Sequence, residues 1–386
     1  MKTFNQLYPQ IVAFENLLLA VRNCERGKRY RHDAGSFRTN REREILQLQR
    51  ELKAQCYHPG EYRERVIHRP KRRLISAAPY RDRVVHHALC QVVMPLFERR
   101  MIQDLYSNRD DMGTHAAIRR CRHFTRRYRY VLKCDIRKFY PSIDLEILKQ
   151  IMRRTIRCRE TLWLLDTIID HSNPQEAVCA LFPGDDLAEA ASRRIGLPIG
   201  NLTSQWFGGI YLTPFDHWVK QELRCGGYLR YVDDFLLFSD DKAELRDWRA
   251  AIVDRLAQVR LRLHAGKSRT HRVADGVTFL GQRIWPHQQR LCRPNVASAR
   301  RRLRWNVRQY LDGTLSKEAL TVRWMSWRGH ALQADTAGLV AQLRRDLVEP
   351  LGPAGTQPPA NACCGAARGT TTRTTCAVRT ATTTIR

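Results

Sequence analysis

The fold of this chain is decided by one stretch, Gly227-Tyr228-Leu229-Arg230-Tyr231-Val232-Asp233-Asp234-Phe235-Leu236-Leu237-Phe238. Two adjacent carboxylates, Asp233 and Asp234, lie between two runs of aromatic and aliphatic residues. The runs predict two buried β-strands, and the acidic pair falls where a tight hairpin would join them. Neighbouring acids repel each other in an apolar hairpin, and a buried charge needs a partner. A divalent cation removes both problems, because acidic, oxygen-rich sites suit Mg²⁺.

A solvated turn that carries two acids is the simplest alternative. The hydrophobic flanks argue against it, and so does a third acid upstream, Asp135. Residues 130–134 predict an apolar strand that ends at Asp135. The chain then turns through Pro141 into a helix that Ser142 or Asp144 could cap. A carboxylate at a strand end is again a natural metal position, and a pair of divalent ions is typical of in-line phosphoryl transfer.

The run Asp135-Ile136-Arg137-Lys138-Phe139-Tyr140, followed much later by Tyr231-Val232-Asp233-Asp234, resembles the palm of a reverse transcriptase. Further blocks in the order of that family extend the resemblance over roughly residues 60 to 285. These blocks are residues 69–75 with 82–89, 107–115, 196–205, 264–268 and 277–281. The resemblance implies an α+β right-hand polymerase fold with fingers and palm. It also implies RNA-directed DNA polymerase activity, which is a nucleotidyl transfer.

The resemblance assigns the metal and catalytic roles to a few residues. It places Asp135, Ile136, Asp233 and Asp234 at the site of two Mg²⁺ ions, or of Mn²⁺ in their place. Asp135 and Asp233 would hold the ions, with Asp234 as a ligand or an electrostatic support. Lys267 would donate a proton to the leaving group or stabilise it.

Substrate contacts are implied in the same way. Arg72 and Arg73, with Lys71 as a weaker candidate, would grip the triphosphate of the nucleotide. Tyr140 matches the family's sugar gate, where a ring under C2′ excludes ribonucleotides. The nucleotide and template side would be lined by Ile199, Gly200, Ser204 and Gln205, and the primer end would be supported by Phe279, Leu280 and Gly281.

A departure from the family pattern points to a subgroup. Group II intron enzymes and many other bacterial relatives carry Gln-Gly where Ile199-Gly200 stands here, and Ser-Pro where Ser204-Gln205 stands. The form seen here is similar to the reverse transcriptases of diversity-generating retroelements, bacterial and phage systems that rewrite a target gene through adenine-mutagenised cDNA. Residues 82–89 also resemble that subgroup. This resemblance implies a cytoplasmic enzyme, encoded by a bacterium or phage, that works with a basic accessory variability protein.

The tail carries a second, independent clue. Residues 362–386 have no core-forming pattern and predict a disordered segment. Shifted back by one base, and with suitable wobble bases, their Thr codons become AAC codons for Asn. The shifted string resembles the template repeat of these retroelements, in which AAC codons are the mutable positions. We therefore hypothesise that the reading frame overlaps the template repeat in another frame.

Charge agrees with a nucleic-acid partner. The chain has 67 Lys and Arg against 38 Asp and Glu, a formal charge of +29. Basic residues cluster at 63–83, 119–129, 153–159 and 300–308, several of them beside aromatic residues. One Arg block is more often a solvated face, but the repetition favours binding to an RNA template and a DNA or RNA primer, with dNTPs as substrates.

Other classes of protein are disfavoured. No apolar run is long enough to span a membrane, and the polar start has no signal-peptide core. The 12 cysteines show no paired metal-ligand spacing, so reduced thiols are expected.

The domain organisation follows from periodicity and composition. We predict an N-terminal helical extension over residues 1–60, fingers and palm over 61–286, a helical thumb over 287–350 and a tail over 351–386. Residues 171–195 are expected to form a loop. We expect no RNase H, endonuclease or maturase domain.

Two alternatives stay open. The first is another bacterial reverse transcriptase, of the retron or short group II type, against which the Ser204-Gln205 form and the tail argue. The second is a catalytically silent RNA-binding scaffold with the same fold, which the presence of all three acids disfavours.

Overall fold

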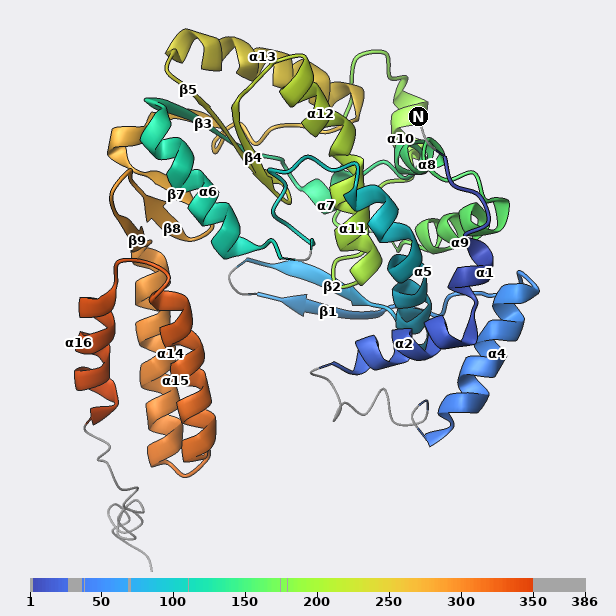
Figure 1. Cartoon of the computed structure of the whole chain (residues 1–386), viewed down its shortest axis with the longest axis horizontal. Helices are drawn as coiled ribbons and strands as arrows, with labels where there is room; N and C mark the ends of the chain where they lie inside the picture. The colour runs from blue at the N-terminus through green and yellow to red at the C-terminus, as the bar shows by residue number, and fades with distance from the viewer. Residues whose placement is uncertain are drawn as a thin grey trace, which may run out of the picture. The chain divides into compact units, whose positions relative to one another are not determined.

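The computed structural model describes residues 3–26, 37, 39–68, 71–109, 111–173, 175–178 and 180–349 (Figure 1). The predicted tail and the first two residues of the 69–75 block lie outside this part of the chain. The chain forms two compact units, Met1–Cys292 and Arg293–Arg386. Each is described by itself.

The first unit mixes helices and strands, which confirms the predicted α+β class. Its helices are α1 (Tyr8–Ile11), α2 (Phe14–Glu25), α4 (Arg41–Lys53), α5 (Tyr80–Glu98), α6 (Thr114–Arg127), α7 (Phe139–Ser142), α8 (Leu145–Arg153), α9 (Arg159–Asp170), α10 (Leu187–Ser192), α11 (Leu202–Tyr211), α12 (Thr213–Gln221) and α13 (Lys242–Gln258). Its strands are β1 (Arg63–Ile67), β2 (Arg73–Ala77), β3 (Tyr130–Asp135), β4 (Gly227–Tyr231), β5 (Asp234–Ser239), β6 (Arg269–Arg272), β7 (Val277–Phe279), β8 (Gln282–Ile284) and β9 (Gln289–Leu291).

The centre of this unit is an antiparallel sheet in the order β4-β5-β3-β6. Its inner strands are apolar on both faces because each face packs on a different core. Phe235 and Leu237 of β5 face the main core, whereas Leu236 and Phe238 face a second core. Helix α13 packs against β5 and β3, and α6 packs against β4 (Figure 1). The predicted buried hairpin is therefore confirmed.

The second core joins α6 to the three-stranded sheet β7-β8-β9. Ile118 and Phe124 of α6 contribute to it together with Val277, Phe279 and Ile284. The main core extends in the other direction to α5, whose long apolar sequence is buried between α2, α1 and α11. Strand β5 is thus covered on both faces, and Asp234 lies at its open end.

Helix α8 starts at the predicted cap. The Asp144 side chain accepts hydrogen bonds from the backbone N–H groups of Glu146 and Ile147, both at 3.0 Å. Ser142 belongs to the short preceding helix α7 instead. The expectation of a loop over 171–195 was wrong in part: α10 forms there, because Asp186 caps it and the small residues that follow favour a helix.

The second unit contains three helices among its described residues, as the predicted helical thumb requires. They are α14 (Arg293–Leu311), α15 (Lys317–Ala331) and α16 (Ala337–Leu347). Helix α14 packs against both others. The domain boundaries at residues 60, 286 and 350 stay predictions.

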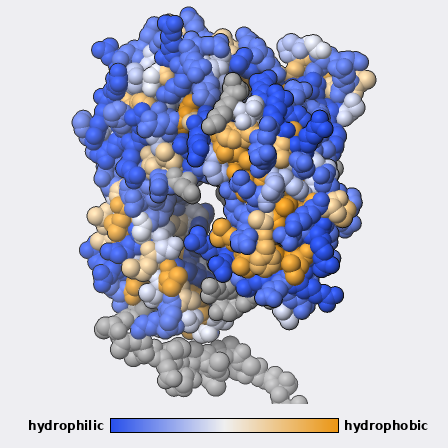
Figure 2. Space-filling view, turned by 45° about the vertical axis from the view of Figure 1, so that its right-hand side comes forward, coloured by the Kyte–Doolittle hydropathy of each residue, from blue (hydrophilic) through white to orange (hydrophobic). Residues whose placement is uncertain are grey.

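The surface in Figure 2 is largely hydrophilic, and the described cysteines are free thiols, as the sequence predicts. Hydrophilic side chains cover most of the face shown in Figure 2. The eight cysteines within the described ranges are all free thiols, and six of them are buried. None of the described helices is long and apolar enough to cross a membrane.

We expect Gly227→Ala to destabilise the first unit by about 1–3 kcal/mol, the usual cost of overpacking a core. A Cβ at Gly227 would lie 2.8 Å from the Cβ of Phe238 and 2.8 Å from a ring carbon of Tyr128. Thermal unfolding of the full chain, followed by circular dichroism, measures the effect.

The matched control is Gly329→Ala in α15, where nothing lies within 4 Å of the added atom. Its helical position favours Ala by up to about 1 kcal/mol. Equal melting temperatures for Gly227→Ala and wild type would contradict the packing described for β4.

Candidate active site

The three acids of the sequence motifs converge at one end of the four-stranded sheet. Tyr231 pairs with Asp234 across the hairpin, so Val232 and Asp233 form a two-residue loop. Asp135, the last residue of β3, pairs directly with Asp234, the first residue of β5. The backbone N–H of Ile136 donates to the Asp233 carbonyl at 3.4 Å. Residues almost 100 positions apart in the chain thereby share one site.

Cationic side chains compensate this negative charge. Lys267 forms an ion pair with Asp135, and Lys133 lies 3.4 Å from Asp234. Lys133 also donates to the Thr278 carbonyl at 3.0 Å, which ties β3 to β7. The motifs did not point to Lys133, although its position two residues before Asp135 puts both side chains on one face of the strand.

Burial and mutual repulsion raise the pKa of Asp233 and of Asp234. Burial, with repulsion from Asp135 and Asp233, raises the pKa of Asp234 to about 6, and Lys133 opposes this rise. Burial also raises the pKa of Asp233, with Asp135 adding to the rise and Arg73 and Lys267 opposing it. A cation bound among these carboxylates would relieve their repulsion, stabilise their charged forms and lower both pKa values.

The donor set fits a divalent ion. One carboxylate oxygen of Asp234, Oδ1, is buried and has no hydrogen-bond partner among the described residues. Carboxylate oxygens are the ligands that Mg²⁺ prefers. Within the described ranges, no three His, Cys, Asp or Glu side chains are close enough to enclose an ion by themselves. Asp135 and Asp234 instead face lysines, so a bound ion would replace these ion pairs.

The loop that carries Lys267 also fixes the backbone of Asp135. The His264 N–H donates to the Asp135 carbonyl at 2.7 Å, and the Asp135 N–H donates to Ser268 Oγ at 3.3 Å. Between these two anchors the chain makes a tight turn, with the N–H groups of Lys267 and Ser268 both donating to the His264 carbonyl. The turn therefore positions the Lys267 side chain over Asp135.

Tyr140 lies near enough to Asp233 to feel its charge, and its role as a sugar gate stays a prediction. Burial raises its pKa to about 12, with Asp233 as the next largest cause. Its ring backs onto α11 at Gly208, where a Cβ would lie 3.2 Å from a Tyr140 ring carbon and 3.1 Å from Phe139. Because Gly208 has no side chain, α11 can pack directly against the Tyr140 ring. A glycine inside an apolar helix is the signal that could have identified it.

Of the three basic residues expected in the fingers, Arg73 is the one whose charge reaches the acids. It is the first residue of β2 and opposes the pKa rise of Asp233. Lys71 and Arg72 are exposed just ahead of the strand. Their contact with a triphosphate stays a prediction.

The segment around Ile199 is docked along β2. The Ser76 N–H donates to the Ile199 carbonyl at 2.9 Å. The Asn201 side chain then bonds both the Ser76 carbonyl, at 2.9 Å, and the Ala78 N–H, at 3.0 Å. Gly200 has a φ of +123°, and a Cβ there would lie 3.0 Å from a methyl of Ile75. Asn201, which sequence reasoning left without a role, joins the fingers to α11.

Ser204 and Gln205, the two remaining residues of this block that we predict to line the nucleotide and template side, differ in exposure. Ser204 is only 2% exposed and packs inside the protein, whereas the Gln205 side chain is exposed. The Gln205 carbonyl accepts a hydrogen bond from Asn108 at 3.1 Å. Gln205 is thus the better placed of the two to meet a template or nucleotide, and both roles stay predictions.

The predicted primer support is a tight turn between β7 and β8. Phe279 pairs with Gln282, so Leu280 and Gly281 form a two-residue loop with φ values of +46° and +80°. Phe279 is anchored in the second core. Phe279 thus anchors one end of the turn, and the contact of the turn with a primer stays a prediction.

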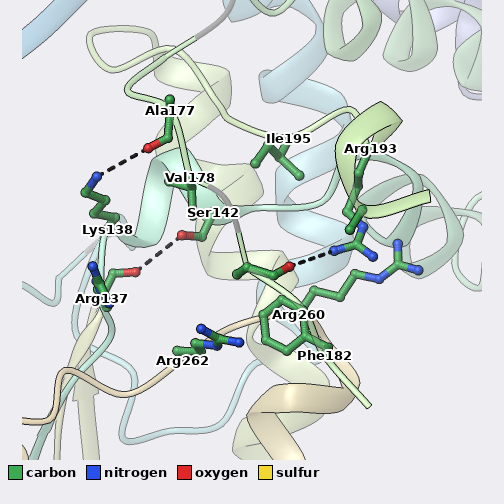
Figure 3. Close-up of a pocket in the computed structure, with 12 residues that line it drawn as sticks. Arg137, Lys138, Ser142, Ala177, Val178, Phe182, Arg193, Ile195, Arg260 and Arg262 are labelled. Carbon is green, nitrogen blue, oxygen red and sulfur yellow. Dashed lines mark hydrogen bonds between the residues drawn. The ribbon is translucent and has the colours of Figure 1, made fainter. Parts of the chain in front are cut away.

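A small basic cavity of about 110 Å³ lies beside the turn that follows Asp135 (Figure 3). Arg193 is ion-paired with Asp185 at 2.5 Å and Arg260 with Asp144 at 2.6 Å. The Arg262 guanidinium stacks on the Phe182 ring at 5.0 Å, and Lys138 pairs with Glu176 at 2.8 Å. Most of its cations are thus matched by the protein itself, and the contacts Lys138–Glu176 and Arg262–Phe182 hold Glu176 and Phe182 against the rest of the unit.

The comparisons with known proteins agree with this site. The family model for reverse transcriptase (RNA-dependent DNA polymerase) matches residues 65–284, more than half of the chain. The chain therefore belongs to the reverse transcriptase family, and the match includes all three acids. Its activity is that of an RNA-directed DNA polymerase, a nucleotidyltransferase, with an RNA template and nucleotides as substrates. Reverse transcriptases generally use divalent metal ions.

Individual relatives are distant. The chain is 25% identical to Protein YkfC of Escherichia coli (strain K12) over 295 residues, 66% of this chain and 74% of that protein. It is 25% identical to Nuclear intron maturase 1, mitochondrial, of Arabidopsis thaliana over 104 residues, 26% of this chain and 15% of the maturase. Among solved structures, apo telomerase from Candida tropicalis matches with a TM-score of 0.46 and 12% identity, over 74% of this chain and 60% of that chain.

We expect Asp135→Ala and Asp233→Ala each to lower Mg²⁺-dependent primer extension by on the order of 10³-fold, because several kcal/mol of transition-state stabilisation depend on bound ions. RNA affinity, measured by filter binding, should change little. Asp247→Ala, which removes an exposed acid paired only with its neighbour Arg246, is the control. Near wild-type extension by either site variant would rule out the metal site.

We expect Tyr140→Ala to admit ribonucleotides, because the 2′-hydroxyl would no longer meet the ring that Gly208 supports. Tyr140→Phe keeps the ring and should keep the selectivity. The measurement is the ratio of kcat/KM for a dNTP and the matching ribonucleotide in each variant. The same ratio in Tyr140→Ala as in wild type would show that the gate lies elsewhere.

Proposed function

We propose that this chain is the mutagenic polymerase of a diversity-generating retroelement, which copies a template-repeat RNA into adenine-mutagenised cDNA. The observation that supports polymerisation most directly is the convergence of Asp135, Asp233 and Asp234 at one end of the sheet, with an unpartnered carboxylate oxygen among them. The subgroup rests on the sequence form around Ile199 and on the tail, which lies outside the described residues.

Asp135 and Asp233 would hold two Mg²⁺ ions, with Asp234 as a further ligand or a support. Bound there, such ions lower the pKa of a primer 3′-hydroxyl and neutralise charge on the triphosphate. Arg73 would approach the triphosphate from β2. Lys267, released from its pair with Asp135, would become available as a donor to the leaving group.

The Ile199 position offers a physical reason for low fidelity. Its backbone carbonyl already accepts a hydrogen bond from the Ser76 N–H, so the contact of interest is that of its side chain. An apolar Ile side chain has no hydrogen-bond donor or acceptor, whereas the Gln that many relatives carry has both. Loss of such a contact would weaken discrimination between correct and incorrect base pairs.

The partners follow from charge and from the subgroup. A formal charge of +29 suits an RNA template and a DNA or RNA primer. A small basic accessory variability protein would complete the system.

A second candidate is an intron-type reverse transcriptase. The 25% identity to a nuclear intron maturase favours it. The two candidates differ in fidelity, because only the retroelement enzyme is expected to err selectively opposite adenine.

The test is to sequence cDNA made on an RNA template with all four bases, with any accessory protein present. We expect errors concentrated opposite adenine, and we expect Ile199→Gln to reduce them about fivefold, the value of one hydrogen bond worth ~1 kcal/mol. Ile199→Leu, which restores no polar group, is the matched control. Uniform high fidelity across template bases would overturn the retroelement assignment and leave a generic reverse transcriptase.

The overlap hypothesis is tested separately. Truncation after Pro359, with the template-repeat RNA supplied in trans, should preserve adenine-directed errors, because the tail would act as RNA rather than as protein. A truncated enzyme that synthesises cDNA without these errors would show that the tail acts as protein.

A further inference from the structure

The largest fully buried side chain among the described residues is a charged one, Arg230 of β4. It lies three residues before Asp233, and its side chain is fully buried. Removing a guanidinium from water is costly unless an opposite charge and hydrogen bonds compensate for the lost hydration. The partners of Arg230 therefore decide what it does. Neither the motifs nor the proposed chemistry assigns it a role.

Arg230 is held by Asp216 of α12. Its Nε donates to Oδ1 of Asp216 at 2.7 Å, and its Nη2 donates to Oδ2 at 2.5 Å. This is the bidentate arrangement that fixes the plane of a guanidinium. The Tyr228 hydroxyl donates to the same carboxylate at 2.6 Å, so Asp216 is itself held in place.

On its other side, the guanidinium contacts the loop of the β4–β5 hairpin, which carries Asp233. Nη1 donates to the Val232 carbonyl at 2.8 Å, and Nη2 also donates to the Gly209 carbonyl of α11 at 3.2 Å. One side chain therefore links α11, α12, β4 and the two-residue loop. A lysine could not replace it, because an ammonium cannot direct hydrogen bonds along a planar fork.

The loop needs this support because its first residue is in an unfavourable conformation. Val232 has a φ of +58°, a region that glycine adopts easily and a β-branched residue adopts at a cost. Both of its backbone polar groups are engaged: the N–H donates to Ser107 Oγ at 3.0 Å, and the carbonyl accepts from Arg230. These two contacts define the peptide planes on either side of Val232, and hence the direction in which Asp233 leaves the loop.

We propose that Arg230 is a positioning residue for polymerisation: clamped by Asp216, it holds the Val232 carbonyl so that the loop presents Asp233 to Asp135. The inference rests on the proposed polymerase function. Arg230 is expected to act on the chemical step, since a displacement of about 1 Å at a reacting centre can lower the rate by ~100-fold.

The experiment must separate positioning from simple stability. Replacing a buried ion pair by apolar residues of similar volume is often neutral or stabilising, whereas removing one partner is strongly destabilising. The main variant is therefore the triple substitution Tyr228→Phe, Asp216→Leu and Arg230→Met, which removes the whole polar cluster. Arg230→Lys serves as the second variant, because it keeps the charge but loses the fork.

We expect the triple variant to keep a wild-type melting temperature while its kcat in primer extension falls about 100-fold, with the KM for dNTP unchanged. In Arg230→Lys we expect a similar fall in kcat. Lys149→Met is the control, since Lys149 is also buried and ion-paired, with Glu146 at 2.9 Å and Asp170 at 2.6 Å, but is remote from the hairpin in the contacts it makes. It should keep its kcat below its melting temperature.

Amide hydrogen exchange provides a readout that does not depend on activity. Peptides that cover residues 228–236 should exchange faster in both Arg230 variants than in wild type, and peptides from α6 should not change. Unchanged exchange across the hairpin, or wild-type kcat in a folded triple variant, would overturn the positioning role. A wild-type enzyme that fails to extend a primer would overturn the proposed function instead, and hydrogen exchange would still decide the role of Arg230.

Discussion

Repulsion among three carboxylates is the constraint on which the rest of this structure depends. Asp135 and Asp234 stand opposite each other on neighbouring strands, with Asp233 in the adjoining loop. Without a bound metal ion, such a group is stabilised by cationic side chains brought to it from the rest of the chain. Lys133 comes from the same strand, Lys267 from the loop that also binds the Asp135 backbone, and Arg73 from β2. Residues from β2, from the sheet itself and from the loop around Lys267 thus neutralise the carboxylates at this end of the sheet.

The parts of the fold that depend on neighbouring residues could be predicted from the sequence. Alternating and continuous apolar runs indicated β3, β4 and β5, and Asp144 was a recognisable helix cap. The contacts that depend on distant residues could not be predicted in this way. Asn201 bonds Ser76, 125 positions away, and Lys133 bonds Thr278, 145 positions away. Nothing local in a polar or basic residue indicates which distant carbonyl it will meet, so Asn201 and Lys133 were found only in the structure.

The two cores on either side of the sheet explain why the site is at the strand ends. The side chains of β5 are used alternately by the main core and by the second core, so neither face of this strand is available to a substrate. What remains is the edge where β3 ends, β4 turns and β5 begins. Helix α11 completes this edge through Gly208, which packs against the Tyr140 ring, and Gly209, whose carbonyl accepts a hydrogen bond from Arg230. A site built on such rigid elements holds its geometry better than one built on long loops.

The two-residue length of the loop between β4 and β5 has a consequence for how this protein can evolve. Side chains alternate between the faces of a strand, so a shift of one residue in the pairing moves each of them to the opposite face. An insertion or deletion after Tyr231 would exchange the residues of β5 between the two cores and turn Asp234 away from Asp135. A substitution in this hairpin changes the contacts of one side chain, but a change in its length alters every contact of the strand at once. The length of this loop is therefore constrained separately from the identities of Gly227, Arg230 and the two acids.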